Sequence, residues 1–199
     1  MTSVEREQKE NEVYRQYRDV IAPFVAELEV RDVEYPIEIF NEIRSVFTHI
    51  SRYKLQNSEQ DLLSAGRHIK RAILDCYKYL CISMAEELFS FRQKYQTIDL
   101  HLADNGRFLP ELDRLEANAK NCYLKAKKAE TAMQVSDDEL YCLYEDAFNS
   151  YSEAIRFKEE SADAILFASN HSKNADRINS ISIIVTLISI AVAIAAWFF

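Results

Sequence analysis

Basic side chains cluster in one short stretch of an otherwise acidic chain. The stretch "GRHIKRAILDCYK", residues 66–78, belongs to a sequence with 24 Lys and Arg against 32 Asp and Glu. The planar guanidinium of arginine can bond two phosphate oxygens at once, so this composition suits a phosphate ligand. The stretch predicts a binding site for an anionic nucleotide or short oligonucleotide, formed by Arg67, His68, Lys70, Arg71 and Lys78.

Helical spacing places several of these bases on one side. On a helix with 3.6 residues per turn, Arg67, Arg71 and Lys78 lie opposite the apolar residues, which predicts an exposed basic ladder. An alternative stays open, because residues 136–163 hold nine acids and two bases, a net charge of −7. Opposed charge bands on neighbouring helices need no ligand. A second basic run comprises Lys120, Lys125, Lys127 and Lys128.

The stretch "RSVFTH" offers a second candidate for chemistry, with Arg44 and His49 separated by four residues. This pattern resembles the R-x4-6-H motif of HEPN-domain ribonucleases, small α-helical domains of microbial conflict systems. The wider stretches "YPIEIFNEIRSVFTHISR" and "GRHIKRAILDCYK" are also similar to HEPN-type helical proteins. The resemblance implies that Arg44 and His49 act on an RNA phosphodiester, usually across a dimer. The two side chains are about 140° apart around a helix, so either could instead border the core.

Other catalytic patterns are missing from the sequence. It contains no P-loop, no G-x-G-x-x-G, no G-x-S-x-G and no H-E-x-x-H. The cysteines form no C-x-x-C pair, so in a cytosolic domain they are expected to be reduced core residues. They are Cys76, Cys81, Cys122 and Cys142. We expect no cofactor, no metal and no enzymatic activity, unless Arg44 and His49 are catalytic.

An uncharged stretch ends the sequence. Residues 178–199 carry no charge. They correspond to roughly 33 Å of helix, against about 30 Å for a hydrocarbon core. Lys173 and Arg177 precede the stretch, and positive residues tend to stay on the cytoplasmic side. We expect a cytoplasmic helical domain at residues 1–177 and a lipid-embedded transmembrane anchor at 178–199, passing once through the inner (plasma) membrane.

Small residues recur along one face of the expected anchor. Such residues let helices approach closely in lipid, and their hydroxyls can bond across the contact. The stripe predicts self-association into a homo-oligomer, and one helix per chain requires three or more subunits for a pore. Its members are Ser182, Thr186, Ser189, Ala193 and Ala196.

Composition predicts an all-α fold, a cytoplasmic bundle of about five helices followed by one C-terminal transmembrane helix. The chain has only 2 Gly and 3 Pro, too few for a turn-rich fold. Capping signals at Thr2, Ser58 and Ser136 predict helix starts, and Pro36 and Pro110 fit first turns. Pro23 predicts a kink, and residues 104–106 predict a break. Apolar spacing predicts a core-facing side for the second helix, formed by Phe40, Ile43, Phe47 and Ile50.

The overall plan resembles membrane effectors of bacterial anti-phage systems, in particular the Hailong-type signal-gated effectors. That resemblance implies an ion channel or membrane-depolarising protein and a partner enzyme that synthesises its nucleotide signal. A tail-anchored trafficking or apoptosis protein is a further alternative. The apolar seam of residues 140–165 is heptad-like, but "FASNHSKNADR" interrupts it before the expected anchor.

Overall fold

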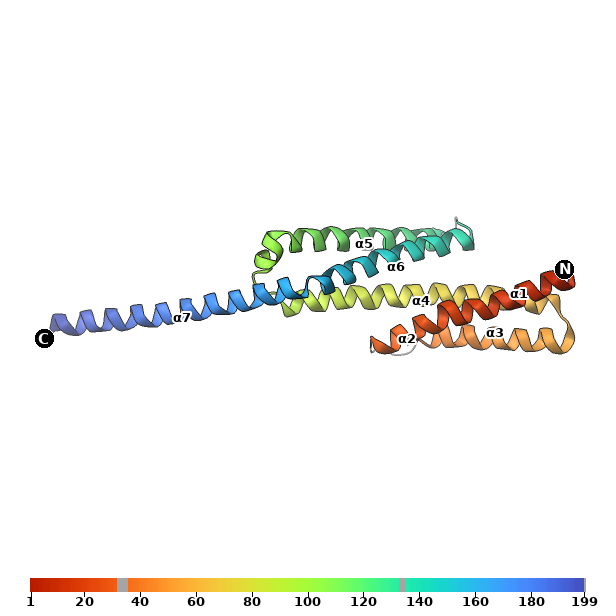
Figure 1. Ribbon diagram of the computed structural model, residues 1–199, viewed down its shortest axis with the longest axis horizontal. Coiled ribbons are helices and arrows are strands. Elements are labelled where there is room, and N and C mark those ends of the chain that lie inside the picture. The colour runs from red at the N-terminus through yellow and green to blue at the C-terminus, as the bar shows by residue number, and fades with distance from the viewer. Residues whose placement is uncertain (32–35, 133–134, 199) are drawn as a thin grey trace. The chain divides into compact units, whose positions relative to one another are not determined.

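The computed structural model describes the backbone of residues 1–31, 36–132 and 135–198, and their side chains except at 175–177, 179–180 and 190–198. Every regular element in this part of the chain is a helix, which confirms the predicted all-α fold (Figure 1). The elements are α1 (Ser3–Gln16), η1 (Tyr17–Ile21), α2 (Ala22–Val30), α3 (Ile37–Gln56), α4 (Glu59–Lys94), η2 (Leu100–Gly106), α5 (Phe108–Ala132), α6 (Asp137–Glu160) and α7 (Ala162–Phe198).

A π-helical turn divides the first predicted helix. The predicted cap is confirmed, since the Thr2 hydroxyl accepts from the Glu5 N–H and the Glu5 carboxylate accepts from the Thr2 N–H. In η1, the Ala22 N–H donates to the Tyr17 carbonyl, five residues back. Pro23 has no N–H to donate and stands in the first turn of α2. The irregularity predicted at this proline therefore takes the form of a wider turn.

A short turn makes α3 and α4 an antiparallel pair. Asn57, with a φ of 53°, ends α3 in the left-handed conformation, and its N–H donates to the Tyr53 carbonyl. The Ser58 hydroxyl then accepts from the Asp61 N–H at 3.2 Å, which confirms the predicted start of the next helix. Because the turn is short, the two helices lie side by side and run in opposite directions from it (Figure 1).

The chain divides into two compact units. The first comprises Met1–Glu87 and Leu115–Glu153. Its core brings apolar faces of several helices together, and the buried Tyr144 donates its hydroxyl to Glu130 Oε2 at 2.6 Å. The main buried residues are Val13, Ile21, Val46, Ile50, Leu62, Ile69, Ile73, Tyr77, Ala126 and Tyr144.

The predicted core side of α3 is partly wrong. Ile50 is buried as expected, but Phe40 and Phe47 are 54% and 51% exposed. Ile39 and Val46, each one position earlier, are buried in their place. A shift of one residue rotates the side-chain direction by about 100° around the helix axis. The observed register therefore places both rings outside the core.

The cysteines follow the expectation only in part. Cys76 and Cys81 are buried, and burial raises the pKa of each thiol to about 12. Cys122 is half-buried and Cys142 is exposed, and all four are free thiols. The prediction that all four are core residues is therefore wrong for Cys142.

The second unit comprises Leu88–Arg114 and Ala154–Phe199. Its predicted break at residues 104–106 is confirmed, since Asp104, Asn105 and Gly106 all have positive φ. After this turn the ring of Phe108 stacks on that of Phe157, with centroids 5.7 Å apart. This unit anchors the beginning of α7, where Ile165 is buried, and α7 packs against η2.

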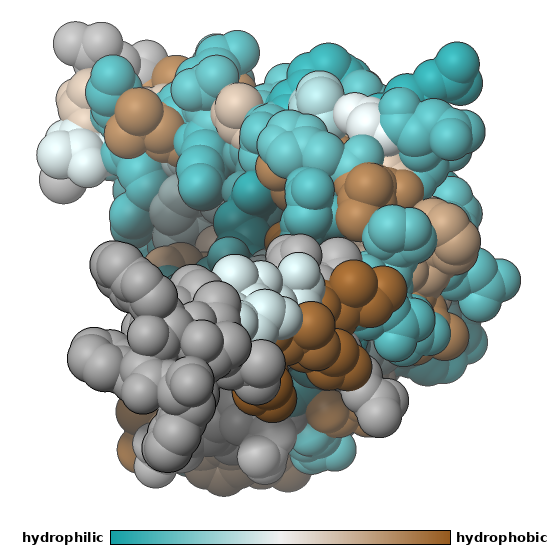
Figure 2. Space-filling model, turned by 90° about the vertical axis from the view of Figure 1, so that its left-hand side faces the viewer, coloured by the Kyte–Doolittle hydropathy of each residue, from teal (hydrophilic) through white to brown (hydrophobic). Residues whose placement is uncertain are grey.

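The helix α7 continues without interruption into the uncharged segment. A single residue, Ser161, separates it from α6, and "SNHSKNADR" lies within the helix. All side chains from Ile181 to Ser189 are exposed. Figure 2 looks from the side on which α7 ends, and apolar side chains are visible there in brown. Among the described residues, no helix combines the length and apolarity that crossing a membrane requires.

Candidate functional site

Two histidines lie together between α3 and α4. His49 belongs to the ribonuclease-like motif, and His68 belongs to the predicted anion site. The rings of His49 and His68 stack with centroids 5.2 Å apart and planes inclined by 19°. His49 Nδ1 lies 2.7 Å from Asp61 Oδ1, and His68 Nδ1 lies 2.6 Å from Glu42 Oε2. Each imidazole of the pair therefore has its own carboxylate, supplied by the opposite helix.

The antiparallel register of the two helices explains this arrangement. Glu42 and His49 are seven residues apart on α3, and Asp61 and His68 are seven residues apart on α4. Seven residues are nearly two helical turns, so each carboxylate and its helix-mate histidine share one face. Pairing those faces antiparallel places Glu42 opposite His68 and His49 opposite Asp61.

The carboxylates fix what the imidazoles can do. A neutral imidazole that donates its Nδ1–H to a carboxylate leaves Nε2 as a base or hydrogen-bond acceptor. Hydrogen bonds from Ser58 and then from His49 lower the pKa of Asp61, so this carboxylate stays ionised at neutral pH. The side chains of His49 and His68 are 22% and 23% exposed, so the pair is half-buried and only partly accessible. The geometry suits proton transfer or contact with an anion.

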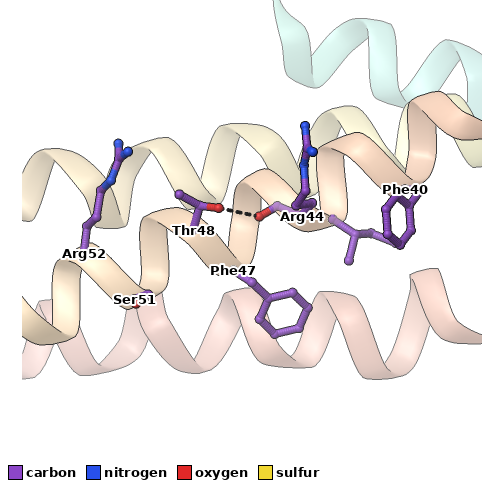
Figure 3. A pocket seen from close by; sticks show the side chains of 7 residues that line it. Phe40, Arg44, Phe47, Thr48, Ser51 and Arg52 are labelled. Atoms are coloured by element: carbon purple, nitrogen blue, oxygen red, sulfur yellow. Dashed lines mark hydrogen bonds between the residues drawn. The ribbon is translucent and has the colours of Figure 1, made fainter.

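Arg44 is not part of this cluster. It is exposed on the outward side of α3, where it lines a hollow together with Arg52 (Figure 3). No contact joins Arg44 to His49 among the described residues, although the two belong to one sequence motif. The catalytic assignment of Arg44 and His49 remains a prediction.

Acidic residues neutralise part of the predicted basic site. Lys70 pairs with Asp138 at 2.5 Å, and Lys78 pairs with Glu130 at 2.6 Å and Asp75 at 3.3 Å. Burial raises the pKa of Glu130, but hydrogen bonds from Lys78, Tyr144 and Lys127 outweigh it and lower the pKa to about 2. The open alternative, in which this stretch faces the acidic segment 136–163, thus describes Lys70, whereas Lys78 pairs with acids outside that segment.

The rest of the ladder keeps its charge available. Arg67 and Arg71 are exposed, and Arg67 Nη2 donates to Ser64 Oγ at 2.8 Å. Neither arginine forms an ion pair within the described part of the chain. Lys78, by contrast, is only 22% exposed, so its predicted place on an exposed ladder is wrong. The cause is Glu130, which reaches it from α5.

The small-residue stripe is described in part. Ser182, Thr186 and Ser189 are exposed, and the hydroxyls of the last two donate to the carbonyls of Ser182 and Val185. The side chains of Ala193 and Ala196 lie outside the described residues. Self-association through this face therefore remains a prediction.

Sequence reasoning missed the carboxylates of the site. Asp61 belongs to the capping signal that begins at Ser58, and it was considered only as part of that helix start. Glu42 was not singled out. The signal was an acid followed by a histidine seven residues later, occurring once on each side of a short turn. In the residues that the structure describes, no three or more His, Cys, Asp and Glu side chains come together as a metal site.

No protein-family model, curated protein or solved structure matches the chain.

Proposed function

We propose that the protein is an oligomeric membrane effector whose membrane helix is gated by an anionic nucleotide or oligonucleotide. The observation that carries the proposal is the exposure of apolar side chains on α7. Its side chains from 181 to 189 are exposed on every side, and Ile183 and Leu187 are 62% and 61% exposed. A helix that is apolar all round is normally buried, in protein or in lipid.

The sequence supports lipid as the surroundings of this helix. Residues 178–199 carry no charge, and Lys173 and Arg177 precede them. We propose a single-pass anchor in the inner membrane, with the preceding helices in the cytoplasm. The face of Ser182, Thr186 and Ser189, continued by Ala193 and Ala196, would bring three or more copies together around a pore.

The ligand site of this proposal lies on α4. Arg67 and Arg71 are exposed without an acid partner in the described part of the chain, and His68 lies beside them in sequence. Arginine forks recognise phosphate bidentately. The proposal places the protein among anti-phage effectors similar to the Hailong type, with a partner enzyme that synthesises the signal.

Ion flux from liposomes tests the proposal. Purified full-length protein is reconstituted, and flux is measured with and without a mixture of short single-stranded oligonucleotides. For the native protein we expect ion flux in one of the two conditions. In Arg67→Glu/Arg71→Glu the flux should no longer depend on the oligonucleotides. Lys125→Glu/Lys128→Glu on α5 changes the net charge equally and should respond as the native protein does. Absence of flux in both conditions would contradict the channel.

The paired histidines favour a second candidate function, a membrane-tethered ribonuclease. The resemblance to HEPN proteins implied Arg44 together with His49, whereas this arrangement uses His49 together with His68. In that reaction one imidazole removes the proton of the RNA 2′-hydroxyl, which attacks the adjacent phosphorus. The bond from phosphorus to the 5′-oxygen breaks, and the other imidazole protonates that leaving oxygen. Acid–base catalysis of this kind contributes about 10²–10⁴-fold. RNA cleavage in EDTA should fall by about that factor in His49→Gln, and unchanged cleavage would exclude this candidate.

A further inference from the structure

The outward face of α3 forms a shallow hollow of about 670 Å³. Its two edges differ in chemistry. In Figure 3, Arg44 and Arg52 project to one side of the helix, and Phe47 projects to the other. All residues that line the hollow belong to this one helix: Phe40, Ile43, Arg44, Phe47, Thr48, Ser51 and Arg52.

The arginine edge carries two charges at a defined spacing. Arg44 and Arg52 are eight residues apart, or about 12 Å along the helix. Both are exposed, and neither forms an ion pair within the described residues. The lysines at 70 and 78 of the neighbouring helix, by contrast, are paired with acids. The two guanidinium groups are about 80° apart around the helix axis, and Arg52 also lowers the pKa of Asp61 through its charge. Two exposed positive charges along one helix suit a ligand that repeats its negative charge.

The aromatic edge presents two rings to solvent. Phe40 and Phe47 are 54% and 51% exposed. Tyr17 contacts the Phe47 ring in an edge-to-face arrangement, with centroids 5.9 Å apart and planes at 74°. This contact orients the ring while about half of it stays accessible. Exposed rings of this kind can stack on nucleic-acid bases, at about 1–3 kcal/mol per base.

We infer that a single-stranded oligonucleotide lies along α3, with phosphates on Arg44 and Arg52 and bases on Phe40 and Phe47. Positive charge along the backbone with aromatic rings beside it is the general way in which proteins bind single strands. The inference rests on the proposed function and gives its ligand a second contact surface, separate from Arg67 and Arg71.

Binding of a fluorescein-labelled single strand to the full-length protein in detergent tests this inference. Arg44→Glu/Arg52→Glu should weaken binding at least tenfold. It should also reduce the slope of log K against log salt by about 1.4, because each phosphate contact on a single strand contributes about 0.7. Phe40→Leu/Phe47→Leu should weaken binding about 5-fold or more at an unchanged salt slope, because stacking is lost and the charges remain.

Three outcomes would overturn the inference. If Arg67→Glu/Arg71→Glu abolishes binding and Arg44→Glu/Arg52→Glu does not, the α3 surface is wrong and the proposed function stands. If the native protein binds no oligonucleotide, both fail. If Phe40→Leu/Phe47→Leu changes the oligomer mass but not the affinity, the rings form a protein contact. Lys125→Glu/Lys128→Glu is again the charge-matched control, and circular dichroism verifies that each variant is folded.

Discussion

His49 and His68 face each other across α3 and α4 with their rings 5.2 Å apart, and each is bonded to a carboxylate of the other's helix. The two histidine–carboxylate contacts are therefore joined through one ring contact. A change on either helix that moves one ring also moves the surroundings of the other.

This sharing predicts energetic coupling between the two histidines. His49→Ala and His68→Ala should each destabilise the fold, and the double variant should deviate from additivity by about 0.5–1.5 kcal/mol. Urea unfolding in detergent of the native protein, the two single variants and the double variant measures the coupling. Strictly additive losses would show that the stacked rings contribute nothing to each other.

Lys78 is expected to matter for stability and not only for ligand binding. Lys78→Met leaves Glu130 without its closest cation and should lower the free energy of unfolding by about 1–3 kcal/mol. Lys70→Met is the matched control, because its pair with Asp138 is more exposed and should be worth less than about 1 kcal/mol. Equal losses in the two variants would contradict the difference in burial.

The lowered pKa of Glu130 predicts how the stability of the fold depends on pH. Its pKa is about 2 in the fold against an ordinary value of 4.5. A carboxyl with a lowered pKa stabilises the fold fully above its unfolded pKa, and the contribution disappears as pH falls through the folded pKa. Stability should therefore decrease between about pH 4.5 and 2, and less steeply in Glu130→Gln. Parallel pH profiles of the two proteins would count against this.

Gly106 has a φ of 86°, and a Cβ placed there would meet only the His101 carbonyl at 3.6 Å. The cost of a side chain is therefore backbone strain and not a clash. Gly106→Ala should lower the free energy of unfolding by about 1–2 kcal/mol. Gly66→Ala, at a helical position with open space, should be neutral or stabilising by up to about 1 kcal/mol. Thermal unfolding of both variants compares them directly.

Deletion of residues 178–199 should release the protein from membranes. The proposed anchor is the uncharged part of α7, and its removal leaves the capped and packed helices before it in place. Sedimentation after a high-salt wash separates the two forms. A truncated protein that still sediments with membranes would rule out this segment as the anchor.

Local signals in the sequence were sufficient for much of the helical plan. The caps at Thr2, Ser58 and Ser136 and the break before Arg107 depend on a few adjacent residues, and all are present. The contact between α3 and α4 depends on register over many residues, which a single sequence does not specify. The stacked histidines were therefore missed as a pair.

The same limit explains the error on α3. Apolar spacing alone allowed either Phe40 or Ile39 to face the core, because Ile37, Ile39, Phe40 and Ile43 together cover more than one side of the helix. Packing against the neighbouring helices selected Ile39. The rings left outside became one edge of the hollow, so the misassigned positions are those that suggest a binding surface.

The continuity of α7 makes it a lever arm. Its base is fixed where Ile165 and Ala168 are buried, and its far part extends for about 30 Å beyond Ile178 at 1.5 Å per residue. The far end at Phe198 lies about 45 Å from Ala168, so a rotation of about 10° at the base would displace it by about 8 Å, which is most of the diameter of a helix. Side-chain rearrangements of an ångström or so near η2 would thus be amplified severalfold at the far end, without any hinge in between.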